Sequence, residues 1–229
     1  MEDVATQVEQ LLAKESWAAE DIESFRALLR ASGDPNRHLR QAASRLAADN
    51  PDPSGAAAVK QGVVLYLLHR HREAAELLAQ GTDNKERRFY QGQALARLRE
   101  YDKAIEAFER AEDRGWEAKQ VTLEIARLQV LAGDLEAAAT SVDRFARSSE
   151  DDPDWRCVAG MVLEAMGQYD RAVEHYEAAR GLQPSHPAST FRLAYYYDLH
   201  GEESRAVELY RECVAASDAG GATTPERRP

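Results

Sequence analysis

The chain has few of the residues that disulfides, metal sites or membrane spans need. Among 229 residues there are only two cysteines, Cys157 and Cys213, and they form no CxxC pair. Both are expected to act as small hydrophobes inside helices, in a reducing cytoplasm. The sequence contains no long apolar run, and its start, Met1-Glu2-Asp3, lacks basic residues. Neither a membrane span nor a signal peptide is therefore expected.

Motifs of catalysis and cofactor binding are missing as well. There is no GxxxxGK[ST] loop, no GxGxxG after a strand and no HExxH. His69 and His71 are two residues apart and do not share a helical face. The acidic run 150–152 with Asp154 lacks the spacing of a calcium loop and is interpreted as a solvated connection. We therefore expect no enzyme activity, no metal site and no cofactor.

Positive charge is scarce. The chain has 29 Lys and Arg against 40 Asp and Glu, a net charge of -11, and 44% hydrophobic residues. Its one small basic group, Arg37, Arg40 and Arg45, is interpreted as a solvated face, because nucleic-acid binders usually carry a broad basic stripe. This composition predicts a soluble acidic protein that does not bind nucleic acid directly.

What the chain does contain is a unit of 34 residues that recurs. With Pro153 as position 1, Gly160 stands at position 8, Ala172 at position 20 and Tyr176 at position 24. Steps of 34 keep a small residue at position 8 (Gly92, Ala126, Gly160, Ala194), alanine at position 20 (Ala104, Ala138, Ala172, Ala206) and a larger one at position 24 (Phe108, Val142, Tyr176, Tyr210). A shorter upstream copy has Gly62, Ala74 and Leu78 in these places.

This period and these positions resemble the tetratricopeptide repeat (TPR) family, whose unit is a helix, a tight turn and a second helix. The resemblance implies an all-α, right-handed superhelical solenoid of antiparallel helix pairs. It also implies a non-catalytic scaffold that binds proteins. Five repeats are expected, at 55–84, 85–118, 119–152, 153–186 and 187–217.

Packing explains why the repeat needs these residues. A glycine inside a helix costs about 1 kcal/mol relative to alanine, so the glycines at position 8 are expected to face the alanines at position 20 at a close helix crossing. Gly133, Gly167 and Gly201 follow the first helix of their repeats, where a left-handed residue is favoured. His69 and Arg99 stand there in two repeats, which predicts looser turns.

The two ends of the chain do not follow the repeat. Residues 1–54 show apolar spacing typical of three helices, near 4–12, 21–30 and 39–46, and are predicted to form an N-terminal helical cap. A degenerate repeat within this segment is an alternative. Residues 218–229 have no periodicity and are predicted to be a disordered tail. With no further helix to cover it, the last repeat is expected to be covered by a continuing chain, by a partner, or by self-association through this uncapped C-terminal repeat.

The family resemblance also points to a binding groove. In TPR proteins the first helix of each repeat lines the concave surface, through positions that include 5 and 9. Carried over to this sequence, these positions give Phe89, Gln93, Leu123, Arg127, Met161, Phe191 and Tyr195. The Lys and Asn that chaperone-binding members use there are absent, so a C-terminal carboxylate is not the expected ligand. A mixed apolar, aromatic and Arg wall favours a peptide or protein partner, although some of these side chains could pack between helices instead.

A looser likeness suggests a second role. The runs 62–68, 87–92 and 195–198 are similar to bacterial TPR proteins that carry a C-terminal domain like that of the RNA polymerase alpha subunit. This implies an alternative function as a regulatory or adaptor module of a larger transcription-linked bacterial protein or complex. The chain contains no helix-hairpin-helix domain, so it would be the N-terminal part of such a protein or a shortened relative.

Overall fold

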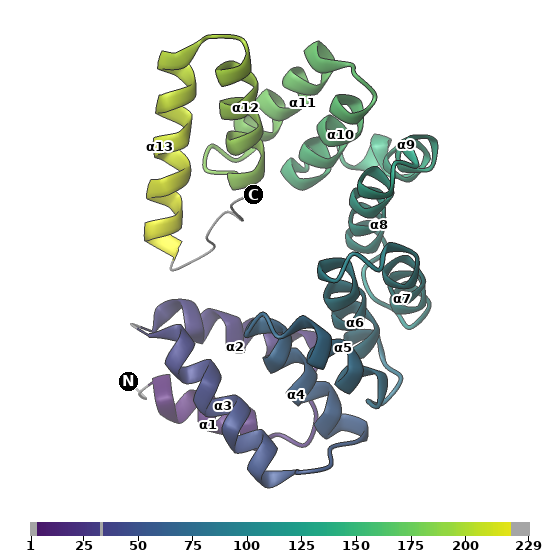
Figure 1. The fold of residues 1–229 in the computed structure, drawn as a ribbon, viewed down its shortest axis with the longest axis vertical. Helices are drawn as coiled ribbons and strands as arrows, with labels where there is room; N and C mark the ends of the chain where they lie inside the picture. Colours follow the sequence, from purple (N-terminus) through teal and green to yellow (C-terminus); the bar gives the residue numbers. More distant parts are fainter. Residues whose placement is uncertain (1–3, 33, 221–229) are drawn as a thin grey trace. The chain divides into compact units, whose positions relative to one another are not determined.

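The computed structural model describes residues 4–32 and 34–220, and this part of the chain contains α-helices and no β-strand (Figure 1). The helices are α1 (Val4–Ala13), α2 (Ala19–Ala31), α3 (Pro35–Asp49), α4 (Gly55–Leu67), α5 (His71–Ala79), α6 (Lys85–Arg97), α7 (Tyr101–Asp113), α8 (Ala118–Ala132), α9 (Leu135–Asp143), α10 (Pro153–Ala165), α11 (Tyr169–Leu182), α12 (Pro187–Leu199) and α13 (Glu203–Gly220). The all-α class predicted from the sequence is confirmed. The chain consists of two compact units, unit 1 (Met1–Val121) and unit 2 (Thr122–Pro229).

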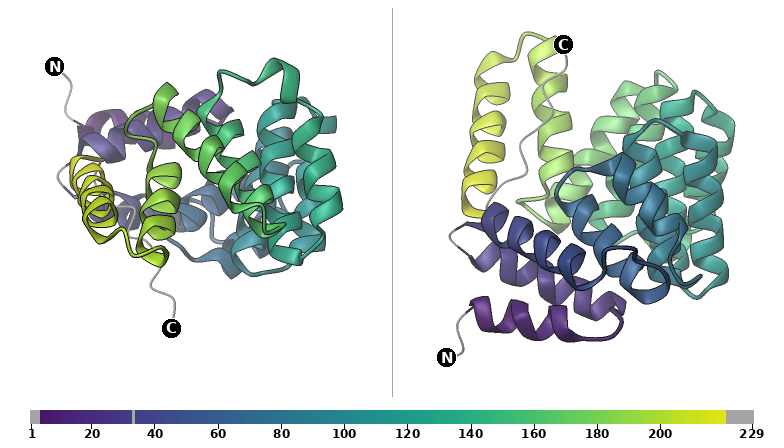
Figure 2. Two further views of the ribbon diagram at one scale, coloured as in Figure 1. Left: turned by 90° about the horizontal axis from the view of Figure 1, so that it is seen from above. Right: turned by 60° about the horizontal axis from the view of Figure 1, so that its bottom comes forward.

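Consecutive helices pack as antiparallel pairs, as Figures 1 and 2 show for α4–α5 and α6–α7 in unit 1 and for α10–α11 and α12–α13 in unit 2. The first helices of the five pairs begin at Gly55, Lys85, Ala118, Pro153 and Pro187. Local chemistry sets two of these starts, because proline is tolerated in the first helical turn, where its missing N–H has no partner to lose. The third pair begins one residue before, and the fifth pair ends three residues after, the repeat ranges predicted from the sequence.

The two helices of a pair approach most closely at position 8. In three repeats a glycine there lies against the side chain at position 24: Gly62 against Leu78, Gly92 against Phe108, and Gly160 against Tyr176. A Cβ added to Gly160 would stand 2.6 Å from Cε1 of Tyr176 and 3.1 Å from the carbonyl oxygen of Ala172. The expected partner of position 8, the alanine at position 20, is thus secondary. The glycine makes room for the large residue at position 24.

The turn between the two helices keeps one geometry in all five pairs. Gly133, Gly167 and Gly201 have φ between 75° and 85°, and His69 and Arg99 have φ of 60° and 62°. The expectation of looser turns at His69 and Arg99 is therefore wrong. Packing of the helices on either side imposes the left-handed backbone, and these two residues adopt it against the preference of an L side chain.

Helices α1 to α3 of unit 1 lie in the segment that the sequence predicts to be an N-terminal cap. Two buried polar side chains of α4 tie them to the first helix pair. Lys60 Nζ donates to the carbonyls of Leu12 (3.3 Å) and Lys14 (2.5 Å), and Gln61 Nε2 donates to the carbonyl of Leu46 (2.7 Å). These acceptors lie at or near helix C-termini, where many carbonyls lack partners within their own helix, although that of Leu46 also accepts from the N–H of Asn50. Burial lowers the pKa of Lys60. The side chains of α4 thus satisfy helix ends of the cap.

Unit 2 holds two apolar cores, each of which joins one helix pair to the next. One core contains Leu123, Ala126, Ala138, Val142, Trp155, Val158, Ala159 and Val162. The other contains Cys157, Ala172, Tyr176, Leu193, Ala194, Tyr197, Ala206 and Leu209. The last helix, α13, continues to Gly220, so residues 218–220 of the predicted tail are helical. The rest of that tail lies outside the described residues.

The close crossing in α10–α11 yields a stability prediction. Gly160→Ala should lower the free energy of unfolding by about 1–3 kcal/mol, the usual cost of overpacking, because the Tyr176 ring is buried and its hydroxyl is held by Glu164 at 2.6 Å. The matched control is Gly181→Ala in α11, where an added Cβ meets nothing within 4 Å. Urea denaturation of both variants measures the effect. Equal stability of the two would contradict the proposed crossing.

The strained turns yield a second prediction. Arg99→Gly should raise the free energy of unfolding by about 1 kcal/mol, because glycine adopts a positive φ without steric strain. Gly167→Ala, at the equivalent turn of another repeat, should lower it by a similar amount. Thermal melting measures both changes, and a destabilised Arg99→Gly variant would mean that the arginine side chain stabilises the turn.

Candidate functional site

In unit 2, the first helices of three consecutive pairs present predicted groove residues at equivalent positions. Arg127 on α8, Met161 on α10 and Tyr195 on α12 all occupy position 9 of their repeats, and Phe191 lies one turn before Tyr195. We call these four residues the unit 2 wall. Ion pairs join the neighbouring helices: Arg127 Nη2 lies 3.9 Å from Asp154 Oδ1, and Arg192 Nη1 lies 3.0 Å from Glu164 Oε1.

The C-terminal end of this wall is aromatic and exposed. The side chains of Phe191 and Tyr195 are 45% and 46% exposed. Tyr210 of α13 adds a third ring, with its centroid 6.1 Å from that of Phe191. Arg127 and Met161 are partly buried. Three aromatic rings from two adjacent helices thus form an apolar surface that is open to a partner.

Two of the predicted groove residues lie in the interior instead. Phe89 and Leu123 are each 5% exposed. Phe89 stacks on Trp116, with ring centroids 4.0 Å apart, and contacts Phe108 edge-on. Position 5 is where one helix pair meets the next, so a side chain there is covered wherever another pair follows. The structure therefore assigns Phe89 and Leu123 to packing, the alternative that the sequence left open.

The remaining predicted residue, Gln93, contacts other side chains of unit 1. Its Oε1 accepts a hydrogen bond from the hydroxyl of Tyr66 at 3.3 Å. Burial raises the pKa of the neighbouring Tyr90 to about 12, and the guanidinium of Arg26, which comes from α2 of the cap, opposes this rise. Helix α2 of the cap therefore lies close to the surface of unit 1 where Gln93 was predicted to line a groove.

A buried polar network, which sequence reasoning missed, links α10 to α12. His186 is the N-cap of α12: its Nδ1 accepts from the backbone N–H of Ser189 at 3.3 Å, and its Nε2 lies 3.3 Å from Asp154 Oδ1. Because Nδ1 accepts that N–H, we assign the ring proton to Nε2, which then donates to Asp154. The signal in the sequence was the position of His186 immediately before Pro187, where an N-cap precedes a proline.

This network has the residue types of a hydrolase triad but not its access. His186 Nδ1 lies 2.9 Å from Ser189 Oγ, so Asp154, His186 and Ser189 form a chain of contacts. Ser189 is fully buried, and burial raises the pKa of the adjacent Cys157 thiol. A substrate could reach neither nucleophile. The network holds the start of α12 on α10.

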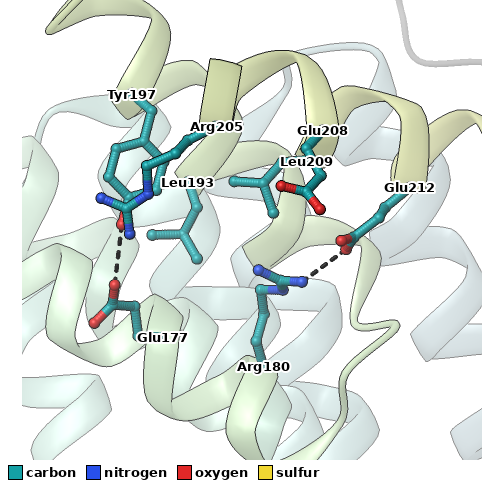
Figure 3. A pocket seen from close by; sticks show the side chains of 8 residues that line it. All are labelled: Glu177, Arg180, Leu193, Tyr197, Arg205, Glu208, Leu209 and Glu212. Atoms are coloured by element: carbon teal, nitrogen blue, oxygen red, sulfur yellow. Dashed lines mark hydrogen bonds and ion pairs between the residues drawn. The ribbon is translucent and has the colours of Figure 1, made fainter. Parts of the chain in front are cut away.

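A pocket of about 390 Å³ lies beside α11, α12 and α13 (Figure 3). Its lining consists of Glu177, Arg180, Leu193, Tyr197, Arg205, Glu208, Leu209 and Glu212. The Tyr197 hydroxyl donates to Glu177 at 3.0 Å and its ring carries the Arg205 guanidinium at 4.0 Å, while Arg180 pairs with Glu212 at 2.7 Å. These contacts run between helices of the last two pairs, so the pocket is a polar seam that joins them.

Within the described residues, no group of three or more His, Cys, Asp or Glu side chains is placed to hold a metal ion. In the same part of the chain, none of the helices combines the length and the apolar character needed to cross a membrane. Both cysteines are free thiols, Cys157 buried and Cys213 partly buried.

Comparison with protein families decides the classification. The model named Tetratricopeptide repeat matches residues 88–153 and 157–221, more than half of the chain. The chain belongs to the tetratricopeptide repeat family. Proteins of this family serve as scaffolds for protein interactions, so a general protein-binding role follows for this TPR chain. No curated protein matches it.

Solved structures share this TPR fold at low sequence identity. The Cut9–Hcn1 structure of the APC/C hetero-tetramer has a TM-score of 0.67 at 16% identity and covers 93% of this chain and 43% of its own. MamA has a TM-score of 0.49 at 16% identity, over 69% of this chain and 94% of its own. YrrB, described as a TPR protein with an unusual peptide-binding site, has a TM-score of 0.48 at 16% identity, over 77% and 92%. The match to Cut9 supports the fold alone, and the likeness to proteins with an RNA polymerase alpha-like domain is not shown.

The cap at His186 is testable through stability. His186→Ala should lower the free energy of unfolding by about 1 kcal/mol, the typical value of an N-cap, whereas His186→Asn should retain most of it, because asparagine caps helices well. His200→Ala, at the exposed opposite end of α12, is the control and should change stability by less than about 0.5 kcal/mol. Chemical denaturation compares the three variants. An Asn variant as unstable as the Ala variant would show that the cap is not what His186 contributes.

Proposed function

We propose that this TPR chain is a non-catalytic cytoplasmic scaffold that binds a peptide or protein partner on the unit 2 wall. Family membership supports the general role. The free cysteines are in keeping with a reducing compartment. The catalytic alternative has no support from the Asp154–His186–Ser189 network, because its serine is buried.

The observation that carries the proposal is a change in exposure along one repeat position. At position 5 the side chains of the first four repeats are at most 5% exposed, namely Val59, Phe89, Leu123 and Cys157. The fifth, Phe191, is 45% exposed, and Tyr195 beside it is 46% exposed. Large apolar side chains that gather on an open surface mark interaction sites more often than scattered ones do. The last helix pair therefore offers the partner a ready apolar surface.

The chemistry of the wall indicates what kind of partner it fits. Aromatic side chains bury much area at a small cost in side-chain entropy, and aromatic and Arg residues dominate binding energy at interfaces. Arg127 and Arg192 are already paired with carboxylates, so they fix the shape of the wall more than they attract an anion. We expect the partner to insert an apolar side chain against Phe191 and Tyr195, presented on an extended or helical segment.

Self-association is the competing use of the same surface. Rings exposed on α12 could pack against those of a second copy, which would cover the last repeat of each chain. Sedimentation of the purified protein over a range of concentrations separates the two uses. A dimer that Tyr195→Ala dissociates would assign the wall to self-association, whereas a monomer at all concentrations would leave it to another protein. No observation favours the transcription-linked alternative.

The binding prediction compares two substitutions on unit 2. Once a pull-down with the full chain has identified a partner, Tyr195→Ala should weaken its binding by about 2 kcal/mol, as expected for a central anchor. Glu174→Ala, an exposed position on α11, should change affinity little. Calorimetric titration measures both affinities, and melting curves check that both variants fold. Equal affinities would place the binding surface elsewhere.

A further inference from the structure

A second pocket, of about 440 Å³, lies in unit 1 where the loop between α5 and α6 meets the end of α7. It is lined by Asp83, Arg88, Arg110, Asp113 and Arg114, and we call it the arginine pocket. Its volume is within the range of ligand sites, about 300–1,000 Å³. Arg88 lies near the start of α6, the first helix of its pair, whereas Arg110 and Asp113 lie at the end of α7, the second helix, and Arg114 follows directly as its C-cap.

One carboxylate organises the arginines of this pocket. Asp83 accepts from Arg87 Nη1 at 3.1 Å, from Arg88 Nε, and from Arg114 Nη2 at 2.5 Å. The hydrogen bond from Arg88 first, and then the charge and hydrogen bond of Arg114, lower the pKa of Asp83 to about 2. Asp83 therefore stays ionised at neutral pH and holds three guanidinium groups from two parts of unit 1 in fixed positions.

The three guanidinium groups carry more N–H donors than the Asp83 carboxylate can accept. Arg87 is satisfied, because its Nε and Nη2 donate to the carbonyls of Leu78 and Ala79. Arg88 and Arg114 each use one nitrogen on Asp83, and the other N–H groups of these two side chains have no acceptor among the described residues. The Arg88 side chain is only 15% exposed, so its position is set by packing.

Positive charge accumulates here although the chain as a whole is acidic. The pKa of Arg87 is lowered by burial and by the nearby charges of Arg88 and Arg110, despite the opposing effect of Asp83. Burial is the largest cause of this shift. The local excess of positive charge follows instead from the lining, in which three arginines face two carboxylates, those of Asp83 and Asp113. The net charge of the chain is -11, so this excess is a local property of the pocket.

We propose that the arginine pocket binds a phosphoryl group carried by a side chain of a protein partner, with Arg88 and Arg114 as the principal donors. Guanidinium groups bind phosphate oxygens through paired, charge-assisted hydrogen bonds. A phosphoryl group carries nearly two charges at neutral pH and three acceptor oxygens, so it gains more from several guanidinium groups than a carboxylate does. The pocket has room for the side chain that carries it. The inference rests on the proposed scaffold role only in taking the partner to be a protein.

The test uses small probes and the full chain. The probes are the blocked tripeptide Ala-phosphoserine-Ala, its Ser and Glu counterparts, and inorganic phosphate, each titrated by calorimetry, with ³¹P NMR for the phosphorus-containing probes. We expect saturable binding of the phosphoserine peptide and none of the Ser peptide. Arg88→Gln and Arg114→Gln should each weaken it about tenfold or more, the factor for losing charge-assisted hydrogen bonds.

The matched control is Arg72→Gln, which removes the same charge from an exposed position of α5 outside the arginine pocket, and it should leave affinity unchanged. Arg114 is 52% exposed, so its variant should fold even if Arg88→Gln does not. Absence of saturable binding of the phosphoserine peptide would overturn the proposal, as would unchanged affinity in Arg114→Gln. If the Glu peptide bound as tightly as the phosphoserine peptide, the arginine pocket would instead be a site for acidic peptides in general. Tighter binding of inorganic phosphate than of the peptide would replace it by a free-anion site.

These outcomes are independent of the unit 2 wall. Tyr195→Ala should leave binding of the phosphoserine peptide unchanged, because Tyr195 belongs to the other unit. Loss of partner binding in Tyr195→Ala with intact phosphopeptide binding would support both sites. Unchanged partner binding in Tyr195→Ala, together with intact phosphopeptide binding, would reject the wall and keep the arginine pocket.

Discussion

The close crossing inside each helix pair is the constraint on which the rest of this structure depends. In three of the pairs a glycine at position 8 leaves room for Leu78, Phe108 or Tyr176 at position 24. A fixed crossing sets how each second helix lies on its first, and so which residues remain to meet the following pair. The cost of placing glycine in the middle of a helix, about 1 kcal/mol, is offset by burial of a large apolar side chain. The same crossing imposes the left-handed turns, even at His69 and Arg99.

Buried polar side chains with specific partners connect the cap helices to the first pair and α10 to α12. Lys60 and Gln61 bond to carbonyls near the ends of cap helices, and His186 bonds both to the start of α12 and to Asp154 of α10. Apolar contacts determine that neighbouring helices pack, but they tolerate small displacements. Directional hydrogen bonds do not tolerate such displacements, because a displacement would leave a buried polar group without its partner, which is costly. These contacts therefore fix the register between successive pairs, and with it the shape of the unit 2 wall.

The two proposed binding sites use different chemistry for a shared structural reason. The aromatic surface of α12 and α13 exists because, among the described residues, no further pair covers position 5 of the last repeat. The arginine pocket exists because a loop and two helix ends bring several guanidinium groups around one carboxylate. A repeat array can supply both kinds of surface, because its loops and helix ends bring charged side chains together and a pair without a following neighbour leaves apolar side chains uncovered. Family membership gives a scaffold, and these local departures from the repeat are where we propose that it binds its ligands.

The 34-residue period by itself determined the helix pairs, their order and the small and large positions of each pair. It could not distinguish Phe89 from Phe191, which occupy the same repeat position. The following pair covers Phe89, while Phe191 is open, so exposure depends on neighbours that lie far away in the sequence. The roles of Lys60 and Gln61 left no signal in the sequence, because a polar residue in a helix shows no period. The arginine pocket required Asp83 and Arg114, 31 positions apart, to meet. Local pattern fixes which elements form, and only packing of those elements in space decides which side chains are buried, paired or available to a ligand.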